Sequence, residues 1–369
     1  MKAWPLIGIG FIQGILLLAH WFIYETWITF WGALTPAPTL VLQAALLLLG
    51  LSFTTAALLG FYFTNPVVTT LYRIAAVWLG VLNFLFLAAL LCWPCCFLLS
   101  LLGLSAFRPL LAAALLALAL IVSLYGLLNA RHIRIHRHTI QLPGLPDAWR
   151  GRTALLLSDL HLGNINGIAF SRRVVALAAS LKPQIIFLPG DLFDGSLIDP
   201  HALTAAFRDL NPPLGIYFSA GNHDEFGHTD LHADAMRLAG IRVLDNEKVV
   251  VDGLLIAGVP CGASSFPVRL GAALETLRPL PGQAAVLLNH IPNRLPIIEQ
   301  AGFSLLLSGH THGGQIFPFT WLTRRAFGKF TYGLQRFGAL QVFTSSGVGS
   351  WGPPMRVGSQ AEMVLLTFA

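Results

Sequence analysis

The chain has 369 residues, of which 55% are hydrophobic and only 11% are charged, with a formal net charge of +6. Soluble domains carry about 25% charged residues, so the composition excludes an ordinary soluble protein over the whole length. Its 25 Phe and 9 Trp residues also exclude intrinsic disorder, because they supply ample apolar surface to bury. Within residues 1–130 the charged side chains are Lys2, Glu25, Arg73 and Arg108. We infer that this first part faces lipid and that the remainder faces water.

Four apolar segments in the first part are long enough for membrane spans, since about 20 apolar residues cross a bilayer. They cover about 5–24, about 39–63 after a Pro-rich breaker, the stretch after Arg73 and the stretch after Arg108. The uncharged stretch between those two arginines predicts one tilted helix that continues along the interface past Pro94. We predict a transmembrane region of about four helices over residues 1–130, whose first segment stays as an anchor.

The basic residues near the ends of the spans predict the orientation, because Lys and Arg stay on the cytoplasmic side. With four spans, Lys2, Arg73 and the run of alternating basic residues at 131–138 all face the cytoplasm. This predicts a multi-pass protein of the inner (cytoplasmic) membrane with its C-terminal part in the cytoplasm. Three or five spans would reverse that side, and residues 27–31 leave room for an extra element. Residues 131–150 are expected to form a basic linker that contacts lipid headgroups.

Four cysteines give no disulfide framework. Cys92, Cys95 and Cys96 lie together in an apolar run, and Cys261 lies far away. The Cys92-x-x-Cys95 spacing matches a redox pair superficially, but small packing residues explain it better in a lipid-like stretch.

In the second part, short apolar runs alternate with helix-like stretches. Five runs end in polar clusters, and they cover residues 154–157, 184–188, 215–218, 285–288 and 305–307. Continuous apolar runs are typical of strands buried on both faces, and ligands gather beyond the carboxyl ends of such strands. We therefore expect the five clusters to meet at one edge of a sheet.

The side chains in these clusters are metal ligands by type. They are Asp159, His161, Asp191, Asn222, His223, His290, His310 and His312. Carboxylate, imidazole and amide groups without a thiol suit divalent Mn²⁺, Fe²⁺ or Zn²⁺, and eight such groups suit two ions. The two-residue spacing of Asp159-x-His161 and His310-x-His312 puts both members on one face of an extended chain, or of a turn just past a strand.

These clusters resemble the blocks of the calcineurin-like metallophosphoesterase family. The matching stretches are Ser-Asp-Leu-His at 158–161, Gly-Asp-Leu-Phe-Asp at 190–194, Gly-Asn-His-Asp at 221–224, Asn-His at 289–290 and Gly-His-Thr-His-Gly-Gly-Gln at 309–315. The last block is similar to the bacterial membrane-associated branch, which includes phosphoesterases directed at lipids. The resemblance covers about residues 150–369 and implies an α/β (α+β) domain over 151–369, with two packed mixed sheets flanked by helices.

The resemblance also implies a role for each residue. One metal would be held by Asp159, His161, Asp191 and His312. The other would be held by Asp191, Asn222, His290 and His310, so that Asp191 bridges both. His223 would stay free as the catalytic imidazole beside the leaving group. One departure is Val259-Pro260-Cys261-Gly262, where many relatives carry an acidic residue, and this puts the substrate in doubt.

The sequence therefore predicts a membrane-anchored, metal-dependent phosphoric ester hydrolase with two divalent metal ions. Its substrate would be a phosphodiester or pyrophosphate, preferably lipid or lipid-linked, with membrane lipids and no nucleic acid as partners. Two alternatives stay open: a broad phosphodiesterase on soluble nucleotides or phosphoproteins, and a non-catalytic sensor or transport protein. The aromatic and basic segment 316–330 fits a membrane interface or a lid on its own domain equally well. Asp224, Glu225 and residues 228–232 would add ligands or, more simply, start a helix.

Overall fold

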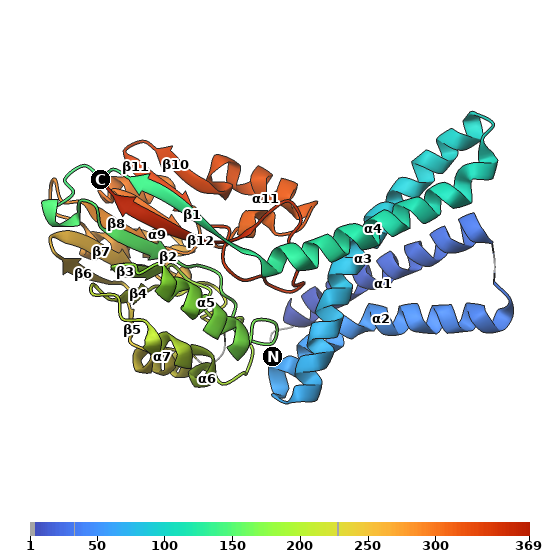
Figure 1. Ribbon diagram of the computed structural model, residues 1–369, viewed down its shortest axis with the longest axis horizontal. Coiled ribbons are helices and arrows are strands. Elements are labelled where there is room, and N and C mark those ends of the chain that lie inside the picture. The colour runs from blue at the N-terminus through green and yellow to red at the C-terminus, as the bar shows by residue number, and fades with distance from the viewer. Residues whose placement is uncertain (1–3, 33, 227–228) are drawn as a thin grey trace. The chain divides into compact units, whose positions relative to one another are not determined.

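A computed structural model describes residues 4–32, 34–226 and 229–369, so Lys2 and His228 lie outside the described residues. The chain folds into two compact units. The helical unit comprises Met1–Leu128 with Gly352–Met355, and the sheet unit comprises Asn129–Trp351 with Arg356–Ala369. Figure 1 shows the helices of the first unit and the layered sheets of the second.

The helical unit contains four long helices, which confirms the predicted helical region. They are α1 (Trp4–Trp31), α2 (Pro36–Tyr62), α3 (Pro66–Leu101) and α4 (Arg108–Arg131), with a short 3₁₀ turn, η1 (Ser105–Phe107), before the last. All four are long and apolar enough to cross a membrane. Large apolar side chains point outward from them, as Leu48 at 69% and Leu110 at 67% exposed illustrate. Such a surface is typical of helices in contact with lipid.

Two helix boundaries differ from the sequence expectation. The third helix begins at Pro66 instead of after Arg73, and it runs through Pro94 without ending. The segment expected to break the chain at 35–38 instead opens α2, because proline fits the first turn of a helix, where its missing N–H has no acceptor to lose. Residues 27–31 complete α1 and form no extra element.

The sheet unit is built from two six-stranded mixed sheets. The first has the order β1 (Ile133–Ile140), β12 (Ala361–Phe368), β2 (Thr153–Leu156), β3 (Ile185–Leu188), β4 (Ile216–Phe218) and β5 (Ile241–Val243). The second has the order β10 (Gly333–Phe337), β11 (Leu340–Thr344), β9 (Leu305–Ser308), β8 (Ala285–Leu288), β7 (Leu254–Gly258) and β6 (Glu247–Val251). Strands β2 to β5 are parallel, as are β7, β8, β9 and β11. All five predicted strands are present, and their burial on both faces agrees with their continuous apolar runs.

The core lies between the two sheets. Leu156 and Phe187 of the first sheet join Val286 and Leu307 of the second in one fully buried cluster. Helices cover the outer faces: α5 (Ile168–Ser180), α6 (Pro200–Thr204) and α7 (Thr229–Leu238) on the first sheet, with α8 (Cys261–Ser264), α9 (Pro267–Leu277) and α10 (Leu295–Gln300) on the second. Helix α11 (Phe319–Phe327) follows the last polar cluster.

Two sequence expectations change in this architecture. The five polar clusters come from two sheets, three from β2, β3 and β4 and two from β8 and β9, instead of from one sheet edge. The basic segment 131–150, expected as a linker, contains β1, which pairs with β12 over its whole length from Ile133 to Ile140. Strand β1 is at the edge of the first sheet, and basic and β-branched residues alternate in it over 133–136.

Candidate metal centre

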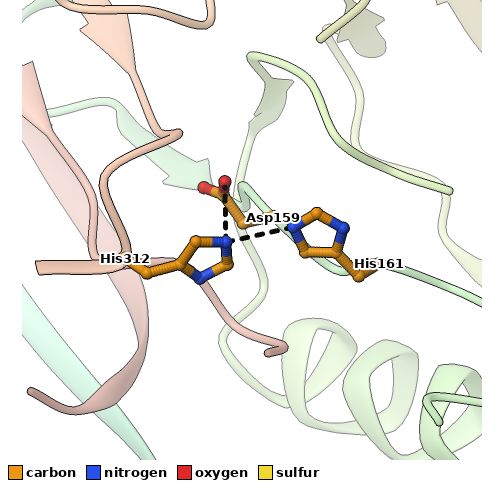
Figure 2. A group of neighbouring side chains, drawn as sticks. All are labelled: Asp159, His161 and His312. Carbon is orange, nitrogen blue, oxygen red and sulfur yellow. Dashed lines mark hydrogen bonds and ion pairs between the residues drawn. The ribbon is translucent and has the colours of Figure 1, made fainter. Parts of the chain in front are cut away.

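All eight predicted site residues converge beyond the carboxyl ends of the two sheets. Three groups of side chains place their ligand atoms within 4.8 Å of one another: Asp159, His161 and His312; His161, Asp191 and His223; and Asp191, His290 and His310. The groups overlap at His161 and Asp191. Asn222 joins them through its Oδ1, which lies 3.0 Å from His310 Nδ1. Figure 2 shows the first group, which brings together loops from both sheets.

The chain turns sharply at these residues. Five of them adopt the left-handed region, with φ between 46° and 71°: Asp159, His161, Asp191, His310 and His312. Non-glycine residues rarely adopt this conformation, and Asp and His are among those that tolerate it best. The left-handed turns, and not an extended chain, therefore direct both members of each two-residue pair into the site.

Two glycines allow the loops to approach one another. A Cβ on Gly309 would clash with the Ser158 hydroxyl and the Asp159 carboxylate, and a Cβ on Gly221 would clash with the Asp191 carboxylate. Because only glycine leaves this space, the loops after β9 and β4 can lie directly against the acids that follow β2 and β3.

Inside the site, imidazole nitrogens lie close to carboxylate oxygens and to one another. His161 Nε2 lies 3.0 Å from His312 Nε2, and His312 Nε2 lies 3.6 Å from Asp159 Oδ1. Asp191 Oδ2 lies 3.0 Å from His290 Nε2 and 3.6 Å from His161 Nε2. His161 Nδ1 is buried without a hydrogen-bond partner. Buried polar atoms are normally satisfied, so this donor set fits divalent cations.

Burial and charge set the protonation of the imidazoles. Burial lowers the pKa of His161 to about 3 and that of His310 to about 4, so both rings are neutral at neutral pH. Burial also disfavours the charged form of His290, but the neighbouring Asp191 outweighs it and raises the pKa of His290 to about 10. Although burial acts to raise the pKa of Asp191, the charge of His290 holds it below the ordinary value.

A second layer of hydrogen bonds orients the candidate ligands. Ser158 Oγ donates to Asp159 Oδ2 over 2.6 Å, and the backbone N–H of His310 donates to Asp159 Oδ1 over 2.9 Å. His290 Nδ1 lies 2.9 Å from the carbonyl oxygen of Pro189, which leaves its Nε2 facing the acids. Such outer contacts fix the tautomer and direction of a ligand.

Asp224 and Glu225 do not face the site as ligands. The Asp224 carboxylate accepts backbone N–H groups from Asp191, Phe193 and Gly221 at 2.7–2.9 Å. Glu225 Oε1 accepts the N–H of Gly262 over 2.7 Å. Asp224 therefore holds together the loops after β3 and β4. Burial, followed by the charge of Asp191, raises its pKa to about 7.

Sequence reasoning missed Arg356, which is fully buried beside the site. Its guanidinium donates to carbonyl oxygens of three segments and lies 3.3 Å from His312 Nδ1. The accepting carbonyls are those of His312, Ser346, Gly347, Gly349 and Gln360. Residues 347–349 also bond to the backbone at Ser158 and Asp159, which places this segment at the site. No spacing rule marks a lone arginine whose partners are main-chain carbonyls.

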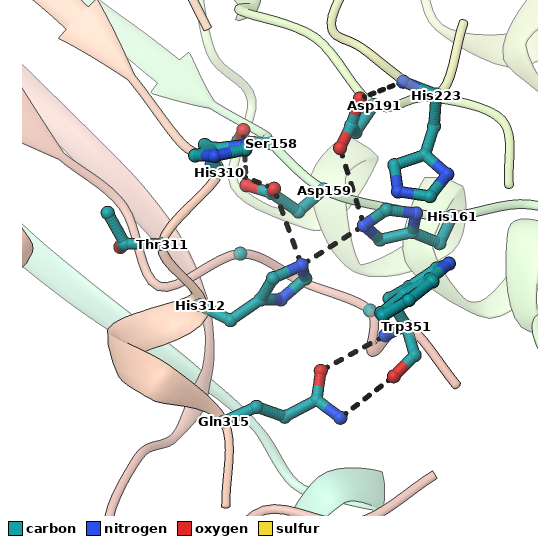
Figure 3. Close-up of polar contacts among 12 residues, drawn as sticks. Ser158, Asp159, His161, Asp191, His223, His310, Thr311, His312, Gln315 and Trp351 are labelled. Atoms are coloured by element: carbon teal, nitrogen blue, oxygen red, sulfur yellow. Dashed lines mark hydrogen bonds and ion pairs between the residues drawn. The ribbon is translucent and has the colours of Figure 1, made fainter. Parts of the chain in front are cut away.

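His223 lies at the rim of the centre. Its ring centroid is 4.8 Å from that of His161 and 5.4 Å from both Phe226 and Trp351, which are each 52% exposed. Figure 3 shows His223 above His161 and Trp351 below it, with the backbone of Trp351 held by the Gln315 side chain through two hydrogen bonds of 3.0 Å. The rim therefore combines an imidazole with exposed aromatic rings.

Comparison with known proteins agrees with this geometry. The family model "Calcineurin-like phosphoesterase" matches residues 153–314. A "Transmembrane protein with metallophosphoesterase domain" from Danio rerio is 29% identical, over 67% of this chain and 60% of its own length. An uncharacterized metallophosphoesterase from Campylobacter jejuni is also 29% identical, over 60% of each chain. The chain thus spans 60% of the length of these two relatives.

Another relative is matched over nearly its whole length. An uncharacterized metallophosphoesterase from Aquifex aeolicus is 32% identical, over 68% of this chain and 97% of its own length. Among solved structures, a dimetal phosphatase from Danio rerio gives a TM-score of 0.39 at 11% identity, covering 60% of this chain and 100% of that one. The family blocks, the matched family model and this relative together identify the chain: it belongs to the calcineurin-like metallophosphoesterases.

Proposed function

We propose that the protein is a membrane-anchored phosphoesterase that uses two divalent metal ions. The observation that carries the proposal is the overlap of three His and Asp groups in one buried centre. One ion would be held by Asp159, His161, Asp191 and His312, and the other by Asp191, Asn222, His290 and His310. Divalent cations such as Mn²⁺, Fe²⁺ or Zn²⁺ would supply the Lewis acidity that activates water and neutralises phosphoryl oxygens.

Asp191 is suited to join the two halves of the centre. Its Oδ2 lies near both His161 and His290, and its Oδ1 accepts the backbone N–H of His223 over 2.9 Å. The carboxylate is thus fixed by the loop after β4 while it faces imidazoles from both sheets. Its low pKa keeps it charged over the whole physiological range.

His223 is suited to move a proton at the leaving group. Its Nδ1 lies 3.2 Å from the carbonyl oxygen of Asp194, so Nδ1–H donates there and Nε2 is left for the substrate. A protonated ring can donate from Nε2 to a departing oxygen. The same ring lies within 4.8 Å of ligand atoms of His161 and Asp191, so the metal content of a His223 variant decides between the two roles.

The substrate we propose is a phosphodiester or pyrophosphate in a lipid or lipid-linked molecule. Four helices suited to membrane spans lie on the same chain as the centre. An anchor raises the effective concentration of a substrate that shares the bilayer and adds little for a soluble one. The exposed rings of Phe226 and Trp351 give the rim apolar surface beside the catalytic imidazole.

The activity can be tested with the full chain in lipid nanodiscs. After chelation and reloading with Mn²⁺, we expect hydrolysis of a chromogenic phosphodiester, and faster hydrolysis of a phospholipid than of its soluble headgroup ester. Loss of both activities in Asp191→Asn, with retention in Asp234→Asn, at a partly buried carboxylate that is outside the three groups and pairs with Arg237, assigns them to this centre. Equal rates on the two substrates would favour a broad phosphodiesterase, and no metal-dependent rate would favour a binding protein.

For orientation, we propose the inner membrane with the sheet unit in the cytoplasm. Arg73 and the arginines at 131, 134 and 137 then lie inside, and Arg108 lies outside. A reporter fused after Ala369 should fluoresce if it is cytoplasm-dependent and stay silent if it is a periplasm-dependent phosphatase. The opposite pattern would place the sheet unit on the outer side.

A further inference from the structure

Helix α11 is fixed against the metal centre by one of its faces. Thr320 packs so closely on Gly314 that a Cβ on Gly314 would clash with the backbone of Thr320. The ring of Phe327 lies 6.0 Å from that of His310, and Thr331, just after the helix, accepts the Thr311 hydroxyl at its carbonyl oxygen over 2.7 Å. Residues 320, 323 and 327 share this inner face, as helical spacing requires.

The outer face of α11 is apolar and exposed. Phe319 is 51%, Trp321 60% and Leu322 46% exposed, and Phe317 before the helix is 51% exposed. None of the nine helix residues is buried. A lid closed on its own domain would bury these side chains. Their exposure therefore favours a membrane interface over a lid as the role of residues 316–330.

The same face is positively charged. Arg324 and Arg325 in the helix, and Lys329 after it, are exposed, and residues 316–330 contain no acid. Among the residues that the structure describes, neither arginine forms an ion pair. Exposed rings beside unneutralised cations are typical of surfaces that bind the headgroup region of anionic membranes.

We propose that this surface, hereafter the α11 surface (Phe317, Phe319, Trp321, Leu322, Arg324, Arg325 and Lys329), docks on an anionic lipid bilayer. The rings would enter the boundary between headgroups and acyl chains, and the cations would lie on lipid phosphates. Charge complementarity favours a bilayer over a protein partner, and the chain itself carries four helices suited to a membrane. This inference rests on the proposed anchoring and is independent of the proposed substrate.

Docking would have a direct consequence for the centre. The inner face of α11 contacts His310 and Gly314, and the outer face would contact lipid. One helix, about 10 Å across, would then separate the metal centre from the headgroups.

The experiment measures the depth of a spin label on the full chain in nanodiscs. The four native cysteines are replaced by alanine, and single labels are placed by Leu322→Cys, Leu48→Cys in α2 and Val268→Cys in α9, where Leu48 is 69% and Val268 85% exposed. Accessibility to oxygen, relative to a water-soluble nickel complex, reports depth. In nanodiscs of phosphatidylcholine with phosphatidylglycerol, we expect the oxygen-to-nickel ratio at 322 to lie between the lipid-like ratio at 48 and the water-like ratio at 268.

Charge provides the matched control. The triple variant Arg324→Gln, Arg325→Gln and Lys329→Gln should move the ratio at 322 toward that at 268, as should pure phosphatidylcholine. A triple variant with the same loss of charge elsewhere on the sheet unit, at the exposed residues Arg237, Lys248 and Arg278, should leave it unchanged.

The outcomes separate this inference from the proposed function. A water-like ratio at 322 with a lipid-like ratio at 48 overturns the docking and leaves the anchoring intact. A water-like ratio at 48 overturns the anchoring itself. A label at 322 that is shielded from both quenchers, whatever the lipid, shows that protein covers the α11 surface and also overturns the proposal.

Discussion

Buried polar side chains are arranged differently in the two units. In the helical unit they pair off: Trp78 Nε1 donates to His20 Nε2 over 2.9 Å, and Trp93 Nε1 donates to the Thr26 hydroxyl over 3.1 Å. The other nitrogen of His20 and the hydroxyl hydrogen of Thr26 bond to carbonyls of their own helix. These groups join one helix to another and leave nothing for a ligand.

In the sheet unit, some buried polar atoms have no partner. Among the residues that the structure describes, every buried side-chain nitrogen or oxygen without a hydrogen bond belongs to this unit, including atoms of His161 and Asn289. Leaving such atoms unsatisfied costs about 1–3 kcal/mol each. Some of these atoms, such as those of Ser171 and Thr344, lie outside the candidate centre, whereas His161 Nδ1 lies within it. The comparison shows that the polar groups of the helical unit are paired between helices, and that the sheet unit leaves a polar atom unpaired at the candidate centre. The following changes test this distinction, in order of expected effect.

Asp191→Asn should abolish turnover and remove both metals. A bridging carboxylate neutralises two cations, and an amide carries no charge to do so. His223→Asn should lower the rate by about 10²–10⁴-fold and spare the metals. Elemental analysis of the purified variants checks this, and equal metal loss in the two would show that His223 is a ligand.

Arg356→Lys should destabilise the sheet unit by about 3 kcal/mol. A single ammonium group is unable to satisfy the carbonyls that the guanidinium fork bonds, and several would be left buried without a donor. We expect the thermal transition in detergent to fall by ~6–12 °C. Arg150→Lys is the control, because that side chain is 62% exposed and pairs with Asp147. Equal melting temperatures for the two variants would contradict the inference that Arg356 stabilises the loops around the site.

Metal binding near neutral pH should release a proton, chiefly from His290. Its raised pKa keeps this ring protonated below about pH 10 in the metal-free centre, and a ligand nitrogen must be deprotonated. Affinity should therefore rise with pH through the neutral range, whereas His161 and His310, with pKa values of about 3 and 4, add no dependence there. Calorimetry in buffers of different ionisation enthalpy counts the protons. A pH-independent affinity between pH 6 and 9 would contradict the assignment of His290.

Trp78→Phe should affect the helical unit alone and only slightly. It removes one hydrogen bond between two helices, worth about 0.6 kcal/mol in a membrane. Helix stability in a denaturing detergent titration should fall by about this amount, with metal content and turnover unchanged. Trp21→Phe, at a side chain that is 59% exposed, should change neither. A loss of metal in Trp78→Phe would mean that the polar pairs of the helical unit also support the centre.

Most of the fold, and the eight residues that converge in the candidate centre, could be predicted from the sequence because their signals are local. Apolar length identifies four helices, and polar clusters after apolar runs identify the strand ends. The division of the clusters between two sheets depends on pairing between distant strands, which no local pattern encodes. Arg356 was not predicted for the same reason, since its partners are main-chain carbonyls of segments far apart in sequence. The exposure of the α11 surface likewise depends on how the helix packs, which the sequence alone does not show.

The left-handed backbone of the centre limits which residues evolution or design could place there. At Asp159, His161, Asp191, His310 and His312, a replacement must both tolerate positive φ and offer a ligand atom. Asp, Asn and His meet both demands, whereas longer or β-branched ligands would add about 1–2 kcal/mol of backbone strain. His290 lies outside this restriction. Attempts to shift the metal preference toward softer ions should therefore start at His290, where a cysteine is free of that backbone cost.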